Sequence, residues 1–183
     1  MAIRLLLLMA LALPAAAAEV AGVKFEDRAR IAQAELALSG AGLRKRLFFD
    51  VYAMALYVGD PKADRIAQGG AKRIAIRMLR EVDAGTFAKA LVDGMRPNHD
   101  EATMKSLEPR IAQLNAIMAG IKEAKKGMAI DLDWHPGGGT QVTIDGKPAG
   151  QPIEGEDFYR ALLRIWLGDK PVQDDLKKAL LGG

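Results

Sequence analysis

Cysteine is absent from this 183-residue sequence, and histidine occurs only twice. The lack of cysteine excludes disulfide bonds, thiolate metal ligands and thiol nucleophiles, and two histidines leave little for a metal site. Charge of one sign is not in marked excess either. The 26 lysines and arginines face 23 aspartates and glutamates, which does not indicate nucleic acid as a partner. What is present is a chain that is 50% hydrophobic and long enough to bury a core without disulfides.

The first 18 residues have the pattern of a cleaved secretory signal peptide. Arg4 is their one positive residue, an apolar run follows, and three alanines end at Ala18. The run is far shorter than the ~20 apolar residues that cross a bilayer, and the small residues suit signal peptidase. We expect cleavage after Ala18, with an uncleaved anchor as the alternative, and a nearly neutral mature chain over 19–183. In a Gram-negative cell that chain would be periplasmic.

Residues 19–183 contain no linker, low-complexity tract or internal repeat, which indicates one domain. Weak alternation predicts a strand over 35–39, and the glycines of 40–42 predict a turn or bend. The segment 43–58 is apolar on both faces and predicts a central strand. Residues 72–80 alternate between apolar and polar, which predicts a half-buried strand.

The remaining segments predict helices around one hairpin. Residues 128–134 and 140–144 alternate cleanly and are followed by Asp145-Gly146, a pair typical of tight turns. Periodicity and capping residues predict helices over 61–68, 83–95, 100–125, 155–168 and 171–181. This order favours an α+β fold, in which a largely antiparallel sheet has its helices gathered on one face.

The polar motifs have structural explanations that outweigh functional ones. Asp131, Asp133 and His135 could begin a metal site, but the solvated face of a half-buried strand shows the same pattern. The glycines at 137–139 lack the lysine and the helix of a phosphate loop. The eight methionines could line a ligand cavity or simply pack in the core. We therefore expect no metal and no cofactor.

A family resemblance rests on four segments: LSGAGLR at 38–44, FDVYAMALYV at 49–58, KRIAIRMLR at 72–80 and the stretch 155–171. Together they resemble the chalcone isomerase-like family, and most of all its bacterial secreted branch. The likeness extends over nearly all of 19–183. It implies an open-faced β-sandwich, a large antiparallel sheet backed by helices, with a ligand cleft between the two.

The resemblance leaves both an enzymatic and a binding function open. Chalcone isomerases hold a substrate for intramolecular ring closure and stabilise its negative charge with a guanidinium, and Arg44 matches that arginine. Polar side chains of the plant enzymes are replaced here by Phe87, Gly94 and Ile165, and Tyr52 replaces a threonine. The loss of these donors argues against isomerase activity.

The fatty-acid-binding members of the family keep the arginine and have a tyrosine at the position of Tyr52. The resemblance therefore implies an exported domain that binds a hydrophobic carboxylate such as a fatty acid, with Arg44 and Tyr52 at the polar end. Eight positions of straight strand span ~26 Å, so either a bend or tight turn lies near 46–50 or another arginine serves, for which Arg80 is the reserve candidate. Further ligand-binding residues are predicted to be Arg80, Met54, Leu56, Ile76, Met78, Phe87 and Leu91. An intramolecular lyase that uses Arg44 and Tyr52, and an interaction module without a ligand, are the alternatives.

Overall fold

The computed structural model describes residues 18–183. Except for Ala18, the predicted signal peptide, residues 1–18, lies outside the described residues. Ala18 itself is the first residue of strand β1 and pairs with Phe25. Within 18–183, no helix combines the length and the apolar character needed to span a membrane.

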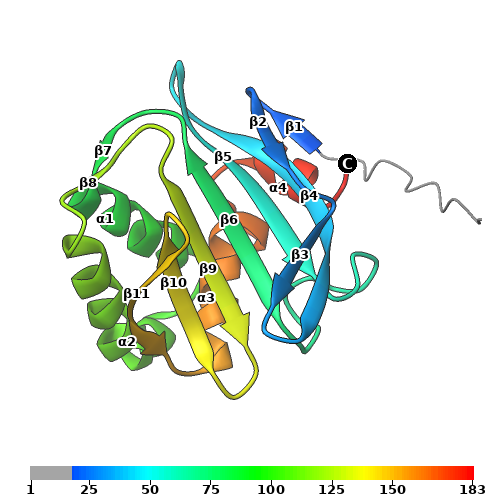
Figure 1. Ribbon diagram of the computed structural model, residues 1–183. Helices are drawn as coiled ribbons and strands as arrows, with labels where there is room; N and C mark the ends of the chain where they lie inside the picture. The colour runs from blue at the N-terminus through cyan, green and yellow to red at the C-terminus, as the bar shows by residue number, and fades with distance from the viewer. Residues whose placement is uncertain (1–17) are drawn as a thin grey trace, which may run out of the picture.

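The centre of the fold is a seven-stranded sheet in which every neighbouring pair is antiparallel (Figure 1). The strand order across it is β11-β10-β9-β6-β5-β4-β3. Its strands are β3 (Arg28–Ile31), β4 (Ala34–Arg46), β5 (Phe49–Val58), β6 (Lys72–Met78), β9 (Ala129–His135), β10 (Gly139–Ile144) and β11 (Lys147–Ile153). Two small ribbons accompany it, β1 (Ala18–Val20) with β2 (Val23–Phe25), and β7 (Val82–Asp83) with β8 (Glu123–Ala124).

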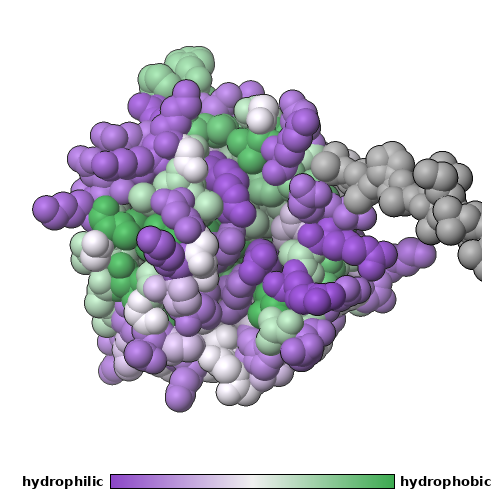
Figure 2. All heavy atoms as spheres, in the orientation of Figure 1, coloured by the Kyte–Doolittle hydropathy of each residue, from purple (hydrophilic) through white to green (hydrophobic). Residues whose placement is uncertain are grey.

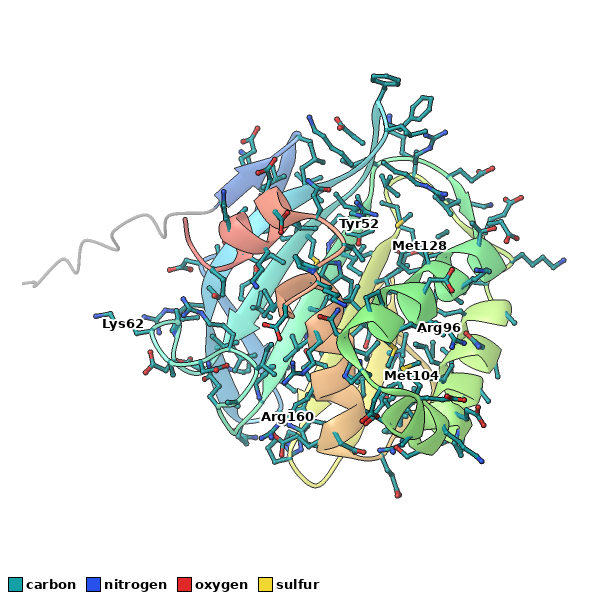
Figure 3. All side chains as sticks on the ribbon, turned by 180° about the vertical axis from the view of Figure 1, so that it is seen from behind. Tyr52, Lys62, Arg96, Met104, Met128 and Arg160 are labelled. Carbon is teal, nitrogen blue, oxygen red and sulfur yellow. The ribbon has the colours of Figure 1, made fainter. Side chains whose placement is uncertain are left out.

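Four α-helices cover one face of this sheet, as Figure 3 shows from behind. They are α1 (Ala84–Met95), α2 (Glu101–Ala119), α3 (Glu156–Leu167) and α4 (Asp174–Leu180), with a single 3₁₀ turn, η1 (Arg96–Asn98), between α1 and α2. Asp83 and Asp100 cap α1 and α2 by accepting the N–H groups of Thr86 and Thr103. The predicted α+β fold with helices gathered on one face is confirmed.

Strand β5 is buried on both faces, as its sequence predicts. On the helix side, Met54 and Leu56 belong to the main core with residues of all four helices. On the other side, Ala53, Ala55 and Tyr57 form a smaller cluster under the β1–β2 ribbon. Four helices cover one face of the sheet and only a short two-stranded ribbon packs on the other, so the sandwich is open-faced.

Of the turn or bend predicted at 40–42, the turn is wrong: β4 continues through these residues, with a bulge between Leu38 and Gly40. The glycines have a different purpose. A Cβ on Gly40 would lie 2.0 Å from the carbonyl oxygen of Ala179, and one on Gly42 would lie 2.7 Å from Leu176 Cδ1. Because Gly40 and Gly42 have no side chains, they leave the space in which α4 packs on the sheet.

Three other boundaries differ from expectation. The segment 61–68 forms turns, because the Asp60 and Asp64 carboxylates accept nearby backbone N–H groups. Helix α2 ends at Ala119 instead of 125, since Lys122 adopts a left-handed φ of 47°. Strand β11, which was not among the predicted elements, contains two prolines in KPAGQPI and lies at the edge of the sheet, where prolines are tolerated.

The aspartates considered as metal ligands form ion pairs across the sheet instead. Asp133 accepts two hydrogen bonds from Arg73, and Asp131 lies 2.6 Å from Arg77 Nη1. Among residues 18–183 there is no cluster of three acidic or histidine side chains suited to a metal. The polar pattern of β9 thus serves to pair it with β6.

Candidate functional site

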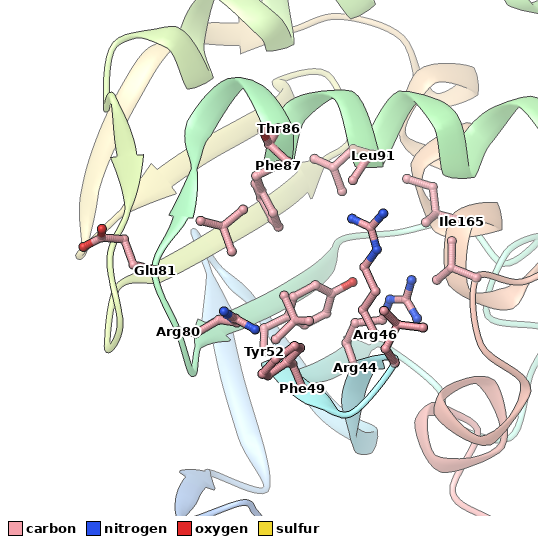
Figure 4. Close-up of a pocket in the computed structure, with 15 residues that line it drawn as sticks. Arg44, Arg46, Phe49, Tyr52, Arg80, Glu81, Thr86, Phe87, Leu91 and Ile165 are labelled. Carbon is pink, nitrogen blue, oxygen red and sulfur yellow. The ribbon is translucent and has the colours of Figure 1, made fainter.

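A cavity of about 420 Å³ opens where the β4–β5 hairpin faces the start of α1 (Figure 4). This volume is within the range of small-molecule sites. Its lining combines three arginines with apolar walls: Arg44, Arg46, Leu47, Phe49, Val51, Tyr52, Arg80, Glu81, Val82, Thr86, Phe87, Ala90, Leu91, Ile165 and Val172. A second hollow of about 590 Å³, beside residues 62–67, is lined mainly by polar groups. The first cavity is the better candidate for an amphipathic ligand.

The hairpin brings Arg44 and Tyr52 side by side. The chain reverses at Leu47 and Phe48, within the interval where a bend or tight turn was one alternative, so Arg44 and Tyr52 become cross-strand partners. Side chains of such partners begin about 5 Å apart. Residues separated by eight positions in the sequence can therefore contact one ligand head group.

The hydroxyl group of Tyr52 is held in a fixed position at the inner end of the cavity. It accepts a hydrogen bond from Trp166 Nε1 at 2.9 Å, and its ring packs edge-to-face on Phe87 with centroids 6.2 Å apart. Tyr52 is only 6% exposed, and this burial raises the pKa of its phenol, while Trp166 and then Arg44 oppose the rise. The phenol is therefore neutral at ordinary pH and has its own hydrogen to donate.

The guanidinium of Arg44 is positioned by a glutamine that lies 129 positions later in the sequence. Arg44 Nη1 donates to the carbonyl oxygen of Lys45 at 2.7 Å and to Gln173 Oε1 at 3.3 Å. Gln173 also binds the strand itself, by accepting from the N–H of Lys45 and donating to the carbonyl of Leu43. The residue that precedes α4 thus fixes this segment of β4.

The arginines of the cavity have no acidic partner among residues 18–183. None of Arg44, Arg46 and Arg80 lies within 4.0 Å of a carboxylate oxygen in that part of the chain. Arg80 instead lies over the ring of Phe49, 4.4 Å from its centroid. In Figure 4, the guanidinium groups of Arg44 and Arg46 lie on the hydroxyl side of Tyr52, and Arg80 lies on the other side. The site therefore offers positive charge to an anion.

The structure gathers five of the predicted site residues around this cavity and leaves four outside it. Arg44, Tyr52, Arg80, Phe87 and Leu91 line it. Met54, Leu56, Ile76 and Met78, also predicted to bind the ligand, do not line this cavity but lie in the main core, each at most 2% exposed. The methionines of β5 and β6 are packing residues.

The cavity residues that the sequence did not reveal come mainly from the hairpin tip and the helix edges. The apolar pattern of 43–58 predicts one strand through Arg46, Leu47 and Phe49, and no glycine or asparagine marks the turn that separates β4 from β5. For Ala90, on α1, and Val172, after α3, no motif or spacing in the sequence indicates a place at a ligand site. Three basic residues followed by three large apolar ones, RKRLFF at 44–49, are the one signal that the sequence offers for this part of the site.

We expect all three tyrosines to resist ionisation in the folded protein. Burial raises the pKa of Tyr57 to about 12, and it also raises the pKa of Tyr52 and Tyr159 above 10. Folding therefore favours the neutral phenols. The resulting stability is complete below the unfolded pKa of roughly 10 and is lost as pH rises through the folded values.

A tyrosinate absorbance titration checks this. Native protein should form tyrosinate only at a higher pH than protein in denaturant, whose tyrosines should titrate near pH 10. A native tyrosine that ionises at the denatured value would contradict the packing described for it.

The fold and the cavity together define an open-faced β-sandwich domain with a small-ligand cleft between sheet and helices. A family model described as chalcone isomerase-like matches residues 17–182, and the chain belongs to this family. None of the curated proteins compared with the chain matches it. The crystal structure of an Arabidopsis thaliana fatty-acid binding protein is similar, with a TM-score of 0.68 at 16% sequence identity. The match covers 87% of this chain and 92% of the plant protein and concerns the fold.

Proposed function

We propose that the protein binds a hydrophobic carboxylate, such as a fatty acid, in the arginine-rimmed cavity, and that it does so without catalysis. One observation carries the proposal. The Arg44 guanidinium has no carboxylate partner among the described residues and lies beside the Tyr52 phenol, at the polar end of a cavity with apolar walls. The fold shared with a plant fatty-acid binding protein supports it.

The two ends of the cavity suit the two ends of such a ligand. A guanidinium can hold a carboxylate through two N–H groups, and the neutral phenol of Tyr52 can donate a third hydrogen bond. The hydrocarbon chain would lie against Phe87, Leu91 and Ile165. Each methylene removed from water contributes about 0.8 kcal/mol, so the apolar walls supply affinity and the polar end fixes the orientation.

Isomerase activity is the less favoured function because the helix side of the cavity is mostly hydrocarbon. Phe87, Leu91 and Ile165 line it there, and Thr86 is the one lining residue of α1 and α3 with a side-chain hydroxyl. Water and a phenolate substrate would therefore be oriented mainly from the hairpin side. Turnover of a chalcone that is abolished in Arg44→Ala would overturn the binding-only proposal.

A cavity-filling variant tests where the ligand binds. Ala90 is exposed on α1 and lines the cavity, whereas its neighbour Lys89 is exposed and does not. We expect Ala90→Trp to reduce the affinity for a fluorescent fatty acid at least about tenfold by occupying space that the chain needs. Lys89→Trp, the matched control, should bind like the wild type. Equal affinities of the two variants would contradict the proposed location, and no binding by the wild type would favour a protein-interaction module.

We further propose that the protein is exported, and in a Gram-negative cell is periplasmic, through cleavage after Ala18. The sequence pattern of residues 1–18 supports this. The intact mass of protein recovered from expressing cells provides the test. The mass of residues 19–183 would support the proposal, and that of the uncleaved chain would overturn it.

A further inference from the structure

The tip of the β4–β5 hairpin exposes three large hydrophobic side chains in succession. Leu47 is 84% exposed, Phe48 97% and Phe49 55%. Figure 1 shows this hairpin projecting beyond the sheet, and Figure 2 shows hydrophobic atoms at its end. Among residues 18–183, the other large hydrophobic residue with marked exposure is Leu181, at 38%. The tip is therefore an unusual concentration of apolar surface.

The geometry of the turn does not require these residues. Leu47 has a left-handed φ of 56°, a conformation that favours glycine or asparagine. The other two-residue hairpin turns among residues 18–183 carry no large hydrophobic side chain. They are Ala21-Gly22, Ala32-Gln33 and Asp145-Gly146. The β4–β5 turn thus places leucine and phenylalanine where neither backbone conformation nor packing within the chain accounts for them.

Basic side chains surround this apolar tip. Arg44, Lys45 and Arg46 lead into it, and Arg80 lies over Phe49 from the neighbouring strand end. Asp50, 3.9 Å from Lys45, and Glu81 are the acidic residues nearest in sequence to these strand ends. Exposed aromatic residues flanked by cations suit the interface of an anionic bilayer, where rings enter the boundary of the acyl chains and cations meet phosphates.

We infer that the hairpin tip binds the surface of an anionic phospholipid bilayer, with Leu47 and Phe48 inserted among the headgroups. Leu47 and Phe49 also line the cavity, so its mouth would face the membrane when the tip is inserted. A fatty acid could then pass between bilayer and cavity with little exposure to water. This membrane contact goes beyond the proposed ligand binding and can be measured without any added ligand.

Vesicle flotation tests the inference with three proteins that comprise residues 19–183. These are the wild type, Phe48→Ser and Leu181→Ser, the last serving as a matched control at the other exposed hydrophobic site. We expect the wild type to float with vesicles of phosphatidylethanolamine and phosphatidylglycerol and to stay unbound with pure phosphatidylcholine. Phe48→Ser should lower the partition coefficient between vesicles and water about tenfold to a hundredfold, because the phenyl ring that would enter the bilayer is lost. Leu181→Ser should partition like the wild type, and high salt should weaken binding.

Further measurements separate this inference from the proposed function. Phe48 does not line the cavity, so Phe48→Ser should bind a fluorescent fatty acid in vesicle-free solution like the wild type. Phe48→Trp should retain vesicle binding and shift its fluorescence to the blue on insertion. Wild-type protein that does not float with anionic vesicles, or equal partition of wild type and Phe48→Ser, would overturn the inference. Self-association that Phe48→Ser abolishes would also overturn it, by assigning the tip to a second copy of the chain.

Discussion

Replacing Arg44 with alanine is expected to weaken the binding of a long-chain fatty acid about tenfold to a hundredfold. A hydrogen bond to a charged group is worth about 1.5–3 kcal/mol, which corresponds to that range of affinity. Arg44→Lys should fall between alanine and wild type, because an ammonium keeps the charge but loses the planar fork. Displacement of a fluorescent fatty acid, confirmed by calorimetry, measures all three affinities.

Two controls make the Arg44 prediction specific. Lys45→Ala removes the same charge from the next residue, which lies outside the cavity lining, and it should leave the affinity within about threefold of the wild type. A fatty alcohol of equal length has no carboxylate, so Arg44→Ala should hardly change its affinity. If Arg44→Ala weakens acid and alcohol alike, the arginine supports the structure of the cavity and does not bind the head group. Thermal unfolding of each variant shows whether the hairpin is intact.

Gly40→Ala is expected to destabilise the protein by about 3 kcal/mol, at the upper end of the usual cost of overpacking. The new methyl group would lie 2.0 Å from the carbonyl oxygen of Ala179, a backbone atom that can move only if α4 shifts. For a domain of this size, the loss corresponds to a melting temperature roughly 6–12 °C lower. Differential scanning calorimetry measures the change directly.

Two other glycines provide the comparison for this variant. Gly69→Ala meets no atom within 4 Å and should unfold within a degree or two of the wild type. Gly42→Ala meets the side chains of Leu176 and Ala179, which can partly adjust, so its effect should be intermediate. A Gly40→Ala protein as stable as Gly69→Ala would show that α4 is not seated on β4 as described.

Much of the fold could be predicted because the alternation of apolar and polar residues, and the residues that cap helices, are local features of the sequence. The alternation of 72–78 and 129–135 marks two adjacent strands, and the caps Asp83 and Asp100 mark the starts of two helices. The predictions that failed concern residues whose structure depends on contacts between segments far apart in the sequence. The glycines of 40–42 resemble a turn until α4, some 140 residues later, is seen to pack on them.

The candidate site could be predicted only in part for the same reason. Arg44 and Tyr52 were identified through the family resemblance. For both to contact one ligand head group, the chain has to turn between them, as it does. Which apolar residues line the cavity depends on where α1 and α3 end over the sheet, and periodicity carries no information on that. Met54 and Met78 share a strand face with Tyr52, yet the helices seal them into the core.

The attachment of α4 has a consequence for the order in which the molecule is completed. Ser39 Oγ donates to the carbonyl of Leu180, and Gln173 holds both Arg44 and its strand. The contacts that hold strand β4 therefore come from residues that are translated much later, 129 positions after Arg44 for Gln173 and 141 after Ser39 for Leu180. A nascent chain can form the β4–β5 hairpin early, but its arginine acquires a fixed orientation only after the segment that leads into α4 has been made.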